Sequence, residues 1–417
     1  MTTTSPGVPR ARFALLTAAS PLHDPAALRP LLESYRAPLR SLGGETWDDG
    51  PAPDAPLVVF VATGGTEQQI LERARLESGE PALLVAHPGH NSLPAALEVL
   101  ARARQMGLRG EVLFLRDPAD VAGLARLAAA VRDRAVRRAL RASRIALVGE
   151  PSDWLVASRP CGELVREVWG PEVVPLPIAP LLAEPDAGIR ARAEVLARSV
   201  RDGAAAVLEP SEEDLLAASL VCALLESVAE AGGFDAVAVR CFDLVAGRGT
   251  TGCVALAHLN ERGIVAGCEG DLASTVTMLW LRHLSGIVPW MANPSRVDRE
   301  RGVLALAHCT VARSLTSGYR LRSHFESGRG VGLQGALPAG PVTLARIGGL
   351  RLERLRAIDG ELLRNTDEPD LCRTQVEVEI GPAALDELLA DPLGNHLVML
   401  PGRWAADLRR WHAAMIG

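Results

Sequence analysis

The sequence predicts two doubly wound, parallel-sheet α/β (Rossmann-like) domains followed by an antiparallel β-barrel-like C-terminal domain. Strand-like and helix-like segments alternate over the first two thirds of the chain, which is typical of parallel sheets covered by helices. From about Val303, short strands separated by Gly and Pro turns indicate antiparallel structure. With 417 residues, 48% of them hydrophobic, each domain can bury its own core. We place the domains at 1–143, 144–300 and 301–417, the last with a closing helix.

The predicted elements follow in chain order. Phe13–Ala19 is interpreted as the first strand, with a secretory signal as the alternative. The following strands of the first domain are Leu57–Ala62, Ala82–Ala86 and Glu111–Leu115, with a helix from Pro94 to about Met106 and a long Arg/Ala helix ending near Ala142. The second domain has strands Arg144–Gly149, Val173–Leu176, Ala236–Val239 and Gly263–Gly267, and helices near 187–202 and 212–231. The last domain has strands Tyr319–Arg322, Gly330–Leu333, Val342–Ile347 and Gln375–Ile380, and a helix from Trp404 to Met415.

The composition excludes several classes of function. The formal charge of −6 gives no electrostatic reason for nucleic acid or an anionic membrane as a partner. Two Tyr and six Phe are too few for a base-stacking platform. Every basic residue is an arginine, so Schiff-base catalysis, lysine-anchored pyridoxal phosphate and a Walker-type phosphate loop are excluded.

The cysteines indicate a reducing compartment. There are seven, an odd number, and no C-x-x-C pair occurs, so neither a disulfide framework nor a zinc knuckle is predicted. We therefore expect a cytoplasmic protein. No uninterrupted apolar run approaches the ~18 residues that a membrane span needs.

Two carboxylates stand where a predicted strand meets a predicted helix. In Cys268-Glu269-Gly270-Asp271, the acids lie at the carboxyl end of the strand and the amino end of the helix, where ligands bind in open α/β sheets. Asp271 alone is equally well explained as a helix N-cap. Glu269 closes an apolar strand and needs a partner such as a cation. Gly270 permits a sharp turn, so the two side chains can converge.

Two histidines are candidates for the same place. His308 ends an apolar strand, and His396 follows Gly394-Asn395. Either is also explained as a hydrogen-bonded core histidine. Oxygen and imidazole ligands without thiolate favour Mn²⁺ or another divalent metal over structural zinc. The predicted metal ligands are therefore Glu269, Asp271, His396 and His308.

Other polar and glycine-rich loops give weaker signals. The glycines at 247, 249 and 252 have G-x-G-x-x-G spacing, but follow only a very short predicted strand, Leu244–Ala246, and no acid stands as a ribose partner. Dinucleotide binding is therefore not predicted. His90 and Asn91 lie in a loop at a strand end, where they either cap a helix or border a substrate site.

Together these residues resemble the L-fucose isomerase and L-arabinose isomerase superfamily, specifically its shorter, fucose-isomerase-like branch. The resemblance concentrates in residues 235–400. It includes the Cys268–Asp271 motif followed by Met278, Ala307-His308-Cys309, His324-Phe325-Glu326-Ser327-Gly328, Pro341–Ile347, Cys372–Gln375 and Pro392–His396. The long insertions of true fucose isomerases are missing.

The resemblance implies Mn²⁺ held by two carboxylates and a histidine. It also implies a homo-oligomer, a trimer or hexamer, whose active site uses a neighbour's N-terminal loops. Asp271 and His396 fit the ligand positions best, and Glu269 fits the acid of the arabinose branch. Which acid binds the metal and which transfers the proton stays open. Asp243 is the nearest counterpart of the family's upstream acid.

The function predicted from this resemblance is a metal-dependent aldose–ketose isomerase acting through a cis-enediol on a sugar or modified sugar, either neutral or anionic. Glu269 and Asp271 are the predicted catalytic residues. Arg373, His90, Asn91 and Asn395 are the predicted substrate-binding residues, whereas Arg320 and Arg346 are expected to be solvated. The alternatives are a metal-dependent epimerase or aldolase, and a non-catalytic sugar-binding protein on the same fold.

Overall fold

A computed structural model describes residues 12–48, 53–74 and 80–416. The chain divides into two compact units, residues 1–139 with 411–417, and residues 140–410. Each unit is described by itself. The boundaries 1–143, 144–300 and 301–417 inferred from the sequence stay a prediction.

The first unit is built on a five-stranded parallel sheet in the order β2-β1-β3-β4-β5. Its strands are β1 (Phe13–Ala18), β2 (Gly44–Thr46), β3 (Leu57–Val61), β4 (Ala82–Ala86) and β5 (Gly110–Phe114), and its helices are α1 (Pro25–Ser41), α2 (Glu67–Arg73), α3 (Ser92–Gln105) and α4 (Val121–Ala142). Strands β1, β3 and β4 are apolar and buried on both faces, as parallel sheets covered by helices require.

The second unit begins with a four-stranded parallel sheet, in the order β10-β9-β6-β7. Its strands are β6 (Arg144–Val148), β7 (Glu172–Leu176), β9 (Ala236–Val239) and β10 (Val265–Gly267). Its helices are α5 (Gly162–Val168), α6 (Ala179–Leu182), α7 (Ala187–Asp202), α8 (Glu212–Gly232), α9 (Phe242–Arg248), α10 (Cys253–Glu261) and α11 (Leu272–Ser285).

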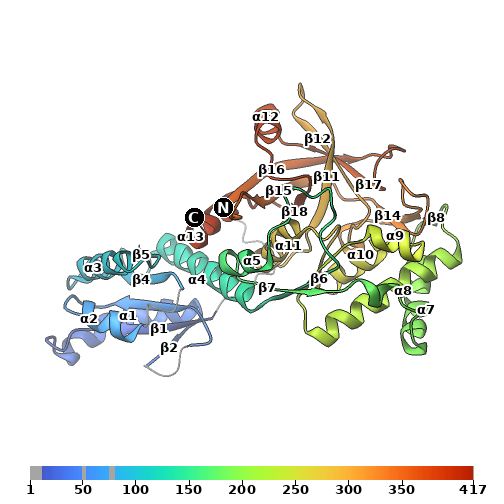
Figure 1. Cartoon of the computed structure of the whole chain (residues 1–417). Coiled ribbons are helices and arrows are strands. Elements are labelled where there is room, and N and C mark those ends of the chain that lie inside the picture. Colours follow the sequence, from blue (N-terminus) through green and yellow to red (C-terminus); the bar gives the residue numbers. More distant parts are fainter. Residues whose placement is uncertain (1–11, 49–52, 75–79, 417) are drawn as a thin grey trace. The chain divides into compact units, whose positions relative to one another are not determined.

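A closed antiparallel barrel completes the second unit, in the order β11-β12-β17-β16-β15-β18. Its strands are β11 (Trp290–Asp298), β12 (Val303–His308), β15 (Gly340–Gly348), β16 (Arg354–Asn365), β17 (Thr374–Glu379) and β18 (Leu397–Pro401); α12 (Pro382–Ala390) and α13 (Ala405–Met415) follow β17 and β18. Figure 1 shows β15 and β16 side by side in this barrel. Helix α11 packs against β10 of the parallel sheet and against β15 and β18 of the barrel. The sheet edge and the barrel therefore meet at this helix.

The predicted fold class is confirmed, with two corrections. Strands β13 (Tyr319–Arg322) and β14 (Gly332–Gly335) do not belong to the barrel. They form a separate three-stranded sheet with β8 (Ala206–Val207), because β8 pairs with the free edge of β13. Residues 244–246, expected as a short strand, lie inside helix α9, so the glycines at 247, 249 and 252 connect two helices.

Helix α8 differs from the expectation of no membrane-length segment. By length and composition it could cross a membrane, although half of its most apolar window is buried inside the structure. Its apolar residues are interrupted by Ser219, Glu226 and Ser227, which is why no uninterrupted run appears in the sequence. It packs against α7 and α10, as a core helix does.

Candidate metal centre

The acidic motif forms a sharp turn at the carboxyl end of β10. Glu269 (φ +62°) and Gly270 (φ +68°) both adopt the left-handed conformation, which costs a non-glycine residue about 1–2 kcal/mol. A Cβ atom at Gly270 would lie 2.8 Å from the Cα of Pro151, so only glycine fits there. The turn expected at Gly270 is present. Backbone strain such as that at Glu269 is typical of functional sites.

Three donor side chains from distant segments converge beside this turn. One donor atom each from Glu269, His308 and His396 lies within 4.8 Å of the others, and all three residues are buried. Glu269 lies between β10 and α11, His308 ends β12, and His396 directly precedes β18. We call these three residues the cavity triad.

His396 has one fixed ring nitrogen and one free one. Its Nδ1 is 2.8 Å from Oδ2 of Asp271. Its Nε2 lies 3.5 Å from Oε1 of Glu269 and is buried with no hydrogen-bond partner among the described residues. Burial lowers the pKa of His396, but the hydrogen bond with Asp271 and the charges of Asp271 and Glu269 outweigh burial and raise it to about 9. A carboxylate that fixes one nitrogen and directs the other at an ion is a common arrangement in metal sites.

His308 is also held through one ring nitrogen. Its Nδ1 is 2.9 Å from the hydroxyl of Thr310, which leaves Nε2 for the cavity. Burial and the neighbouring His396 lower the pKa of His308 to about 4. The ring is therefore neutral at neutral pH, which is the form that binds metals.

Glu269 is held by a tryptophan. Its Oε2 accepts a hydrogen bond of 2.6 Å from Nε1 of Trp154, whose ring meets that of Phe242 edge-on at 4.9 Å between centroids. Burial raises the pKa of Glu269, but the interactions with His396 and Trp154 outweigh it and lower the pKa below its ordinary value. The carboxylate is therefore charged at neutral pH.

Asp271 uses its two oxygens for two tasks. Oδ1 accepts from the backbone N–H of Ser274 at 2.8 Å and so caps helix α11. Oδ2 faces His396 and also accepts from the hydroxyl of Ser274 and from the guanidinium of Arg346. The structure brings Asp271 to Nδ1 of His396, and its carboxylate is not among the donors of the cavity triad.

Arg346 corrects one expectation. It is only 1% exposed rather than solvated, and its guanidinium lies 2.9 Å from Oδ2 of Asp271. Burial raises the pKa of Asp271, but the charge of Arg346 and the contacts with His396 outweigh burial and hold it well below its ordinary value. Arg320, by contrast, is exposed as expected.

The cavity triad fits a divalent cation. Two donors on one ion, each at about 2.1 Å, stand about 3–3.5 Å apart, and Nε2 of His396 and Oε1 of Glu269 are 3.5 Å apart. A buried nitrogen without a partner carries an unmet desolvation cost that a cation removes. Two imidazoles and one carboxylate suit divalent first-row ions such as Mn²⁺, Fe²⁺ and Zn²⁺. The choice of Mn²⁺ stays a prediction.

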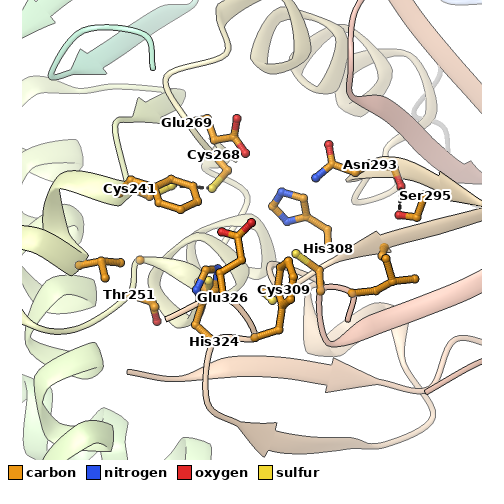
Figure 2. Close-up of a pocket in the computed structure, with 18 residues that line it drawn as sticks. Cys241, Thr251, Cys268, Glu269, Asn293, Ser295, His308, Cys309, His324 and Glu326 are labelled. Carbon is orange, nitrogen blue, oxygen red and sulfur yellow. Dashed lines mark hydrogen bonds between the residues drawn. The ribbon is translucent and has the colours of Figure 1, made fainter. Parts of the chain in front are cut away.

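Two residues of the triad, Glu269 and His308, border a cavity of about 130 Å³ (Figure 2), and His396 lies outside its lining. Two of the lining residues are carboxylates, Glu269 and Glu326, and no arginine from the described part of the chain lines it. Five of the seven cysteines contribute to the wall, and all seven are free. The lining residues are Cys241, Phe242, Val245, Thr251, Gly252, Cys253, Cys268, Glu269, Asn293, Ser295, Ala307, His308, Cys309, His324, Phe325, Glu326, Leu371 and Cys372.

The other predicted site residues lie outside this lining. Nε of Arg373 donates to the carbonyl of Ser323 at 2.7 Å, next to the lining residue Cys372. Asn395 is exposed. Asp243 forms an ion pair with Arg240. The substrate-binding roles of Arg373 and Asn395 stay predictions.

His90 and Asn91 belong to the first unit, between β4 and α3, and both have left-handed backbones, with φ of 54° and 55°. The ring of His90 meets that of His23 edge-on at 5.6 Å between centroids. A role of His90 and Asn91 in substrate binding stays a prediction.

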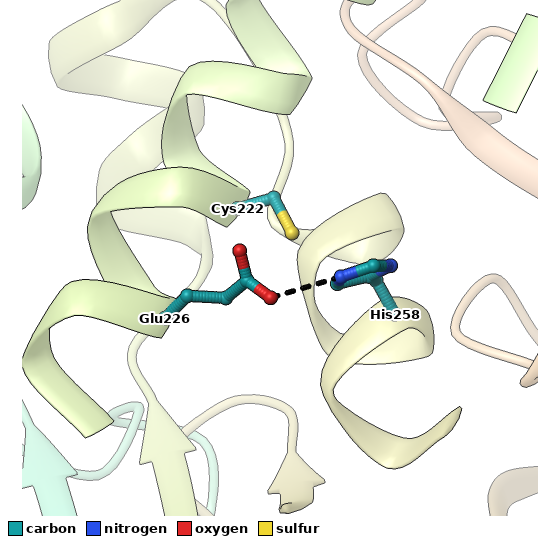
Figure 3. Close-up of side chains that lie close together, drawn as sticks. All are labelled: Cys222, Glu226 and His258. Carbon is teal, nitrogen blue, oxygen red and sulfur yellow. Dashed lines mark hydrogen bonds and ion pairs between the residues drawn. The ribbon is translucent and has the colours of Figure 1, made fainter. Parts of the chain in front are cut away.

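A second cluster of potential metal ligands was not foreseen from the sequence. Donor atoms of Cys222, Glu226 and His258 also lie within 4.8 Å of one another. Figure 3 shows Cys222 and Glu226 projecting from α8 toward His258 on α10. We call these three residues the helix cluster.

The histidine and the carboxylate of the helix cluster are already engaged. Nε2 of His258 is 3.0 Å from Oε1 of Glu226, and the guanidinium of Arg313 is 3.3 Å from Nδ1 of His258. Because Arg313 can only donate, Nδ1 accepts and the proton sits on Nε2, which then donates to Glu226. Arg262 lies 3.3 Å from the same oxygen of Glu226. The cluster is therefore an ion-paired contact between two helices.

Comparison with known proteins finds relatives of this chain. The chain is similar to sulfoquinovose isomerases. It is 29% identical over 204 residues to that of Alkalicoccus urumqiensis, a match that covers 46% of this chain and 45% of the relative. Over 161 residues it is 31% identical to those of Priestia aryabhattai and Priestia megaterium, covering 37% of this chain and 36% of each. No protein-family model matches the chain.

The matches therefore span less than half the length of these relatives. They agree with the resemblance to sugar isomerases read from the sequence. Placement in the shorter fucose-isomerase-like branch stays a prediction.

Proposed function

We propose that this protein is a divalent-metal-dependent aldose–ketose isomerase. The observation that carries the proposal is the free, buried Nε2 of His396, held by Asp271 and facing Oε1 of Glu269 across 3.5 Å. The similarity to sulfoquinovose isomerases supports the reaction class. It also makes an aldose with a sulfonate group the first substrate to test.

The residues of the site divide the work. Glu269, His308 and His396 would hold the ion, with Mn²⁺ as the proposed metal. When bound, a divalent cation polarises the carbonyl of an open-chain aldose and makes the neighbouring C–H bond more acidic. Asp271 keeps His396 in one tautomer and orientation, and Arg346 keeps Asp271 charged. The apolar and thiol-lined wall limits the water around the reacting carbons.

Arg373 is the proposed contact for an anionic substituent. It belongs to the loop beside Cys372, and within the described chain its terminal guanidinium nitrogens have no hydrogen bond or ion pair. A guanidinium fork matches the geometry of a sulfonate. Arg373→Leu is therefore expected to raise KM for a sulfonated sugar with little effect on that for its neutral counterpart.

The test combines metal depletion with product analysis. The purified protein is stripped with a chelator, supplied separately with Mn²⁺, Mg²⁺ or Zn²⁺, and incubated with sulfoquinovose or glucose. Formation of the corresponding ketose, seen by NMR only with a divalent ion present, supports the proposal.

Other products would redirect it. A C2 epimer or smaller fragments would indicate the epimerase or aldolase alternative on the same centre. Binding of the sugar without any turnover under every metal condition would overturn the isomerase proposal and favour a sugar-binding protein.

A further inference from the structure

The inference rests on the proposed function. Isomerisation of an aldose to a ketose needs a group that carries a proton between C2 and C1. Such a group must border the cavity, offer an oxygen or nitrogen free of other partners, and be held in place before the substrate arrives. The carboxylates to consider are Glu269 and Glu326 in the cavity wall and Asp271 behind it.

The two acids predicted from the sequence are already engaged. Both oxygens of Asp271 are hydrogen-bonded and its side chain is inaccessible to solvent. Oε2 of Glu269 accepts from Trp154, and Oε1 faces the free nitrogen of His396. Neither residue has a spare oxygen for the substrate when Glu269 also holds an ion.

Glu326 is free of such partners. Among the residues that the structure describes, its carboxylate takes part in no hydrogen bond or ion pair, and the residue is exposed on the solvent side of the cavity. Figure 2 shows this carboxylate directed into the space that Glu269 and His308 also border.

The turn that carries Glu326 is firmly held. The backbone N–H of Gly328 donates to the carbonyl of His324 at 2.8 Å, and the N–H of His324 donates to that of Arg329. The hydroxyl of Ser327 is 3.2 Å from Nδ1 of His324. A Cβ atom at Gly330 would lie 2.6 Å from the backbone nitrogen of Thr251, so the turn is anchored against the loop before α10. A rigid turn that presents a carboxylate without a partner is suited to bind or react with a ligand.

His324, the other nitrogen base in this wall, packs against aromatic rings. The ring of His324 meets Phe242 edge-on at 5.8 Å and lies 5.6 Å from the ring of Phe325, both between centroids. With Nδ1 directed to Ser327, it forms part of the wall that supports the turn.

We propose that Glu326 is the catalytic base of the isomerisation. The carboxylate takes the proton from C2, the electron pair of that C–H bond becomes the C1–C2 double bond of a cis-enediol, and O1 gains a proton. Glu326 then returns its proton to C1 while the O2 hydroxyl loses one, which leaves a ketose. The protons gained and lost by the sugar balance, so no further reactant is needed.

The test compares Glu326→Gln with the parent on sulfoquinovose. Because positioned proton transfer contributes about 10²- to 10⁴-fold to a rate, kcat of the variant is expected to fall by about that factor. In D₂O, exchange of the C2 hydrogen, followed by NMR, falls equally. Bound metal, the melting temperature and the Kd for the alditol made by reducing sulfoquinovose stay at parental values. Glu326→Ala is expected to recover part of its kcat when formate is added.

Glu300→Gln is the matched control, because Glu300 is an exposed carboxylate outside the cavity lining; it should behave as the parent. Parental kcat and C2 exchange in Glu326→Gln would overturn the role of Glu326 while leaving the proposed function intact. A raised Kd for the alditol with unchanged kcat would mean that Glu326 only binds the sugar, and would also overturn it. Absence of turnover in the metal-loaded parent would overturn the proposed function, and this inference with it.

Discussion

The cavity triad and the helix cluster contain similar donor atoms at similar spacing, yet they have opposite chemical characters. Each brings a histidine and a glutamate within 4.8 Å of a third potential ligand. In the cavity triad, Nε2 of His396 is buried without a hydrogen-bond partner. In the helix cluster, the same nitrogen of His258 is 3.0 Å from Oε1 of Glu226. Arg313 lies at the other ring nitrogen, and Arg262 lies at the same oxygen of Glu226.

The difference shows that proximity of ligand-type residues does not define a metal site. What matters is whether the donor atoms have other partners and which charges surround them. Two arginines contact the histidine and the carboxylate of the helix cluster, so a cation would have to displace them. Behind the cavity triad, Arg346 is paired with Asp271, which in turn contacts His396. The donors facing the cavity therefore remain available.

Replacement of His396, compared with replacement of His258, gives the largest expected effect on metal binding. His396→Ala should lower the affinity for Mn²⁺ by more than the 10- to 100-fold that loss of an outer partner typically costs, and should abolish turnover. His258→Ala should keep both parental. Metal content by elemental analysis and Kd by calorimetry measure the contrast. Equal metal loss in both variants would mean that the two clusters are not chemically distinct.

Removal of the carboxylate behind His396 should separate orientation from ligation. Asp271→Asn should weaken Mn²⁺ binding by about 10- to 100-fold. It should also destabilise the fold by about 3–5 kcal/mol, because Arg346 is left buried and unpaired. Calorimetric Kd values and urea unfolding give the two quantities.

The double variant Asp271→Asn/Arg346→Met tests that separation. It should regain much of the stability, because no unpaired buried charge remains, yet keep the weak metal binding. Parental metal affinity in either variant would contradict an orienting role for Asp271.

Two glycines with similar backbone angles, one near each cluster, differ in the space around them. Gly270 (φ +68°) lies within the acidic turn, and Gly233 (φ +58°) ends helix α8 of the helix cluster. Alanine at either should cost about 1–2 kcal/mol of unfolding free energy for the left-handed conformation. Gly270→Ala should cost a further ~1–3 kcal/mol and weaken Mn²⁺ binding, because its Cβ meets Pro151 whereas that at Gly233 meets nothing within 4 Å. Equal losses, measured by urea unfolding, would argue against this packing constraint.

The smallest effect concerns pH. The hydrogen bond from His258 comes first among the causes that lower the pKa of Glu226 below its ordinary value of 4.5. The charged carboxylate of Glu226 therefore contributes fully to stability above pH 4.5. This contribution is lost as the pH falls through the lowered pKa of Glu226 in the folded state. Glu226→Gln should cost about 1–2 kcal/mol at neutral pH and flatten the decline in acid. Urea unfolding across this pH range checks both; an unchanged profile would contradict the pairing.

Much of the fold could be predicted from the sequence because periodicity is local information. The parallel strands are continuous apolar runs, and the change to turn-rich alternation near Val303 marks the barrel except for its first strand, β11, which begins at Trp290. The separate sheet of β13 and β14 could not be predicted, because its partner β8 is a two-residue strand with no signal of its own.

The site was predicted in part for the same reason. Glu269, His308 and His396 stand beside strands, so their convergence followed from the expected sheet edges. The position of Asp271 behind His396 depends on the turn at Gly270, and the burial of Arg346 depends on the packing of β15 against α11. Trp154 and Glu326 lie in loops without periodicity. The similarity of His324–Gly328 to the sugar isomerases is the one sequence feature that pointed to the turn at Glu326.

The contact between Asp271 and His396 joins positions 125 residues apart, one at the sheet edge and one before the last barrel strand. Contacts of such sequence separation are slow to form, because closing the intervening loop costs entropy. The onset of strong metal binding during folding would thus report the time of barrel closure, because His396 reaches its place only when β18 closes the barrel. A pulse of manganese during refolding would report when that closure occurs.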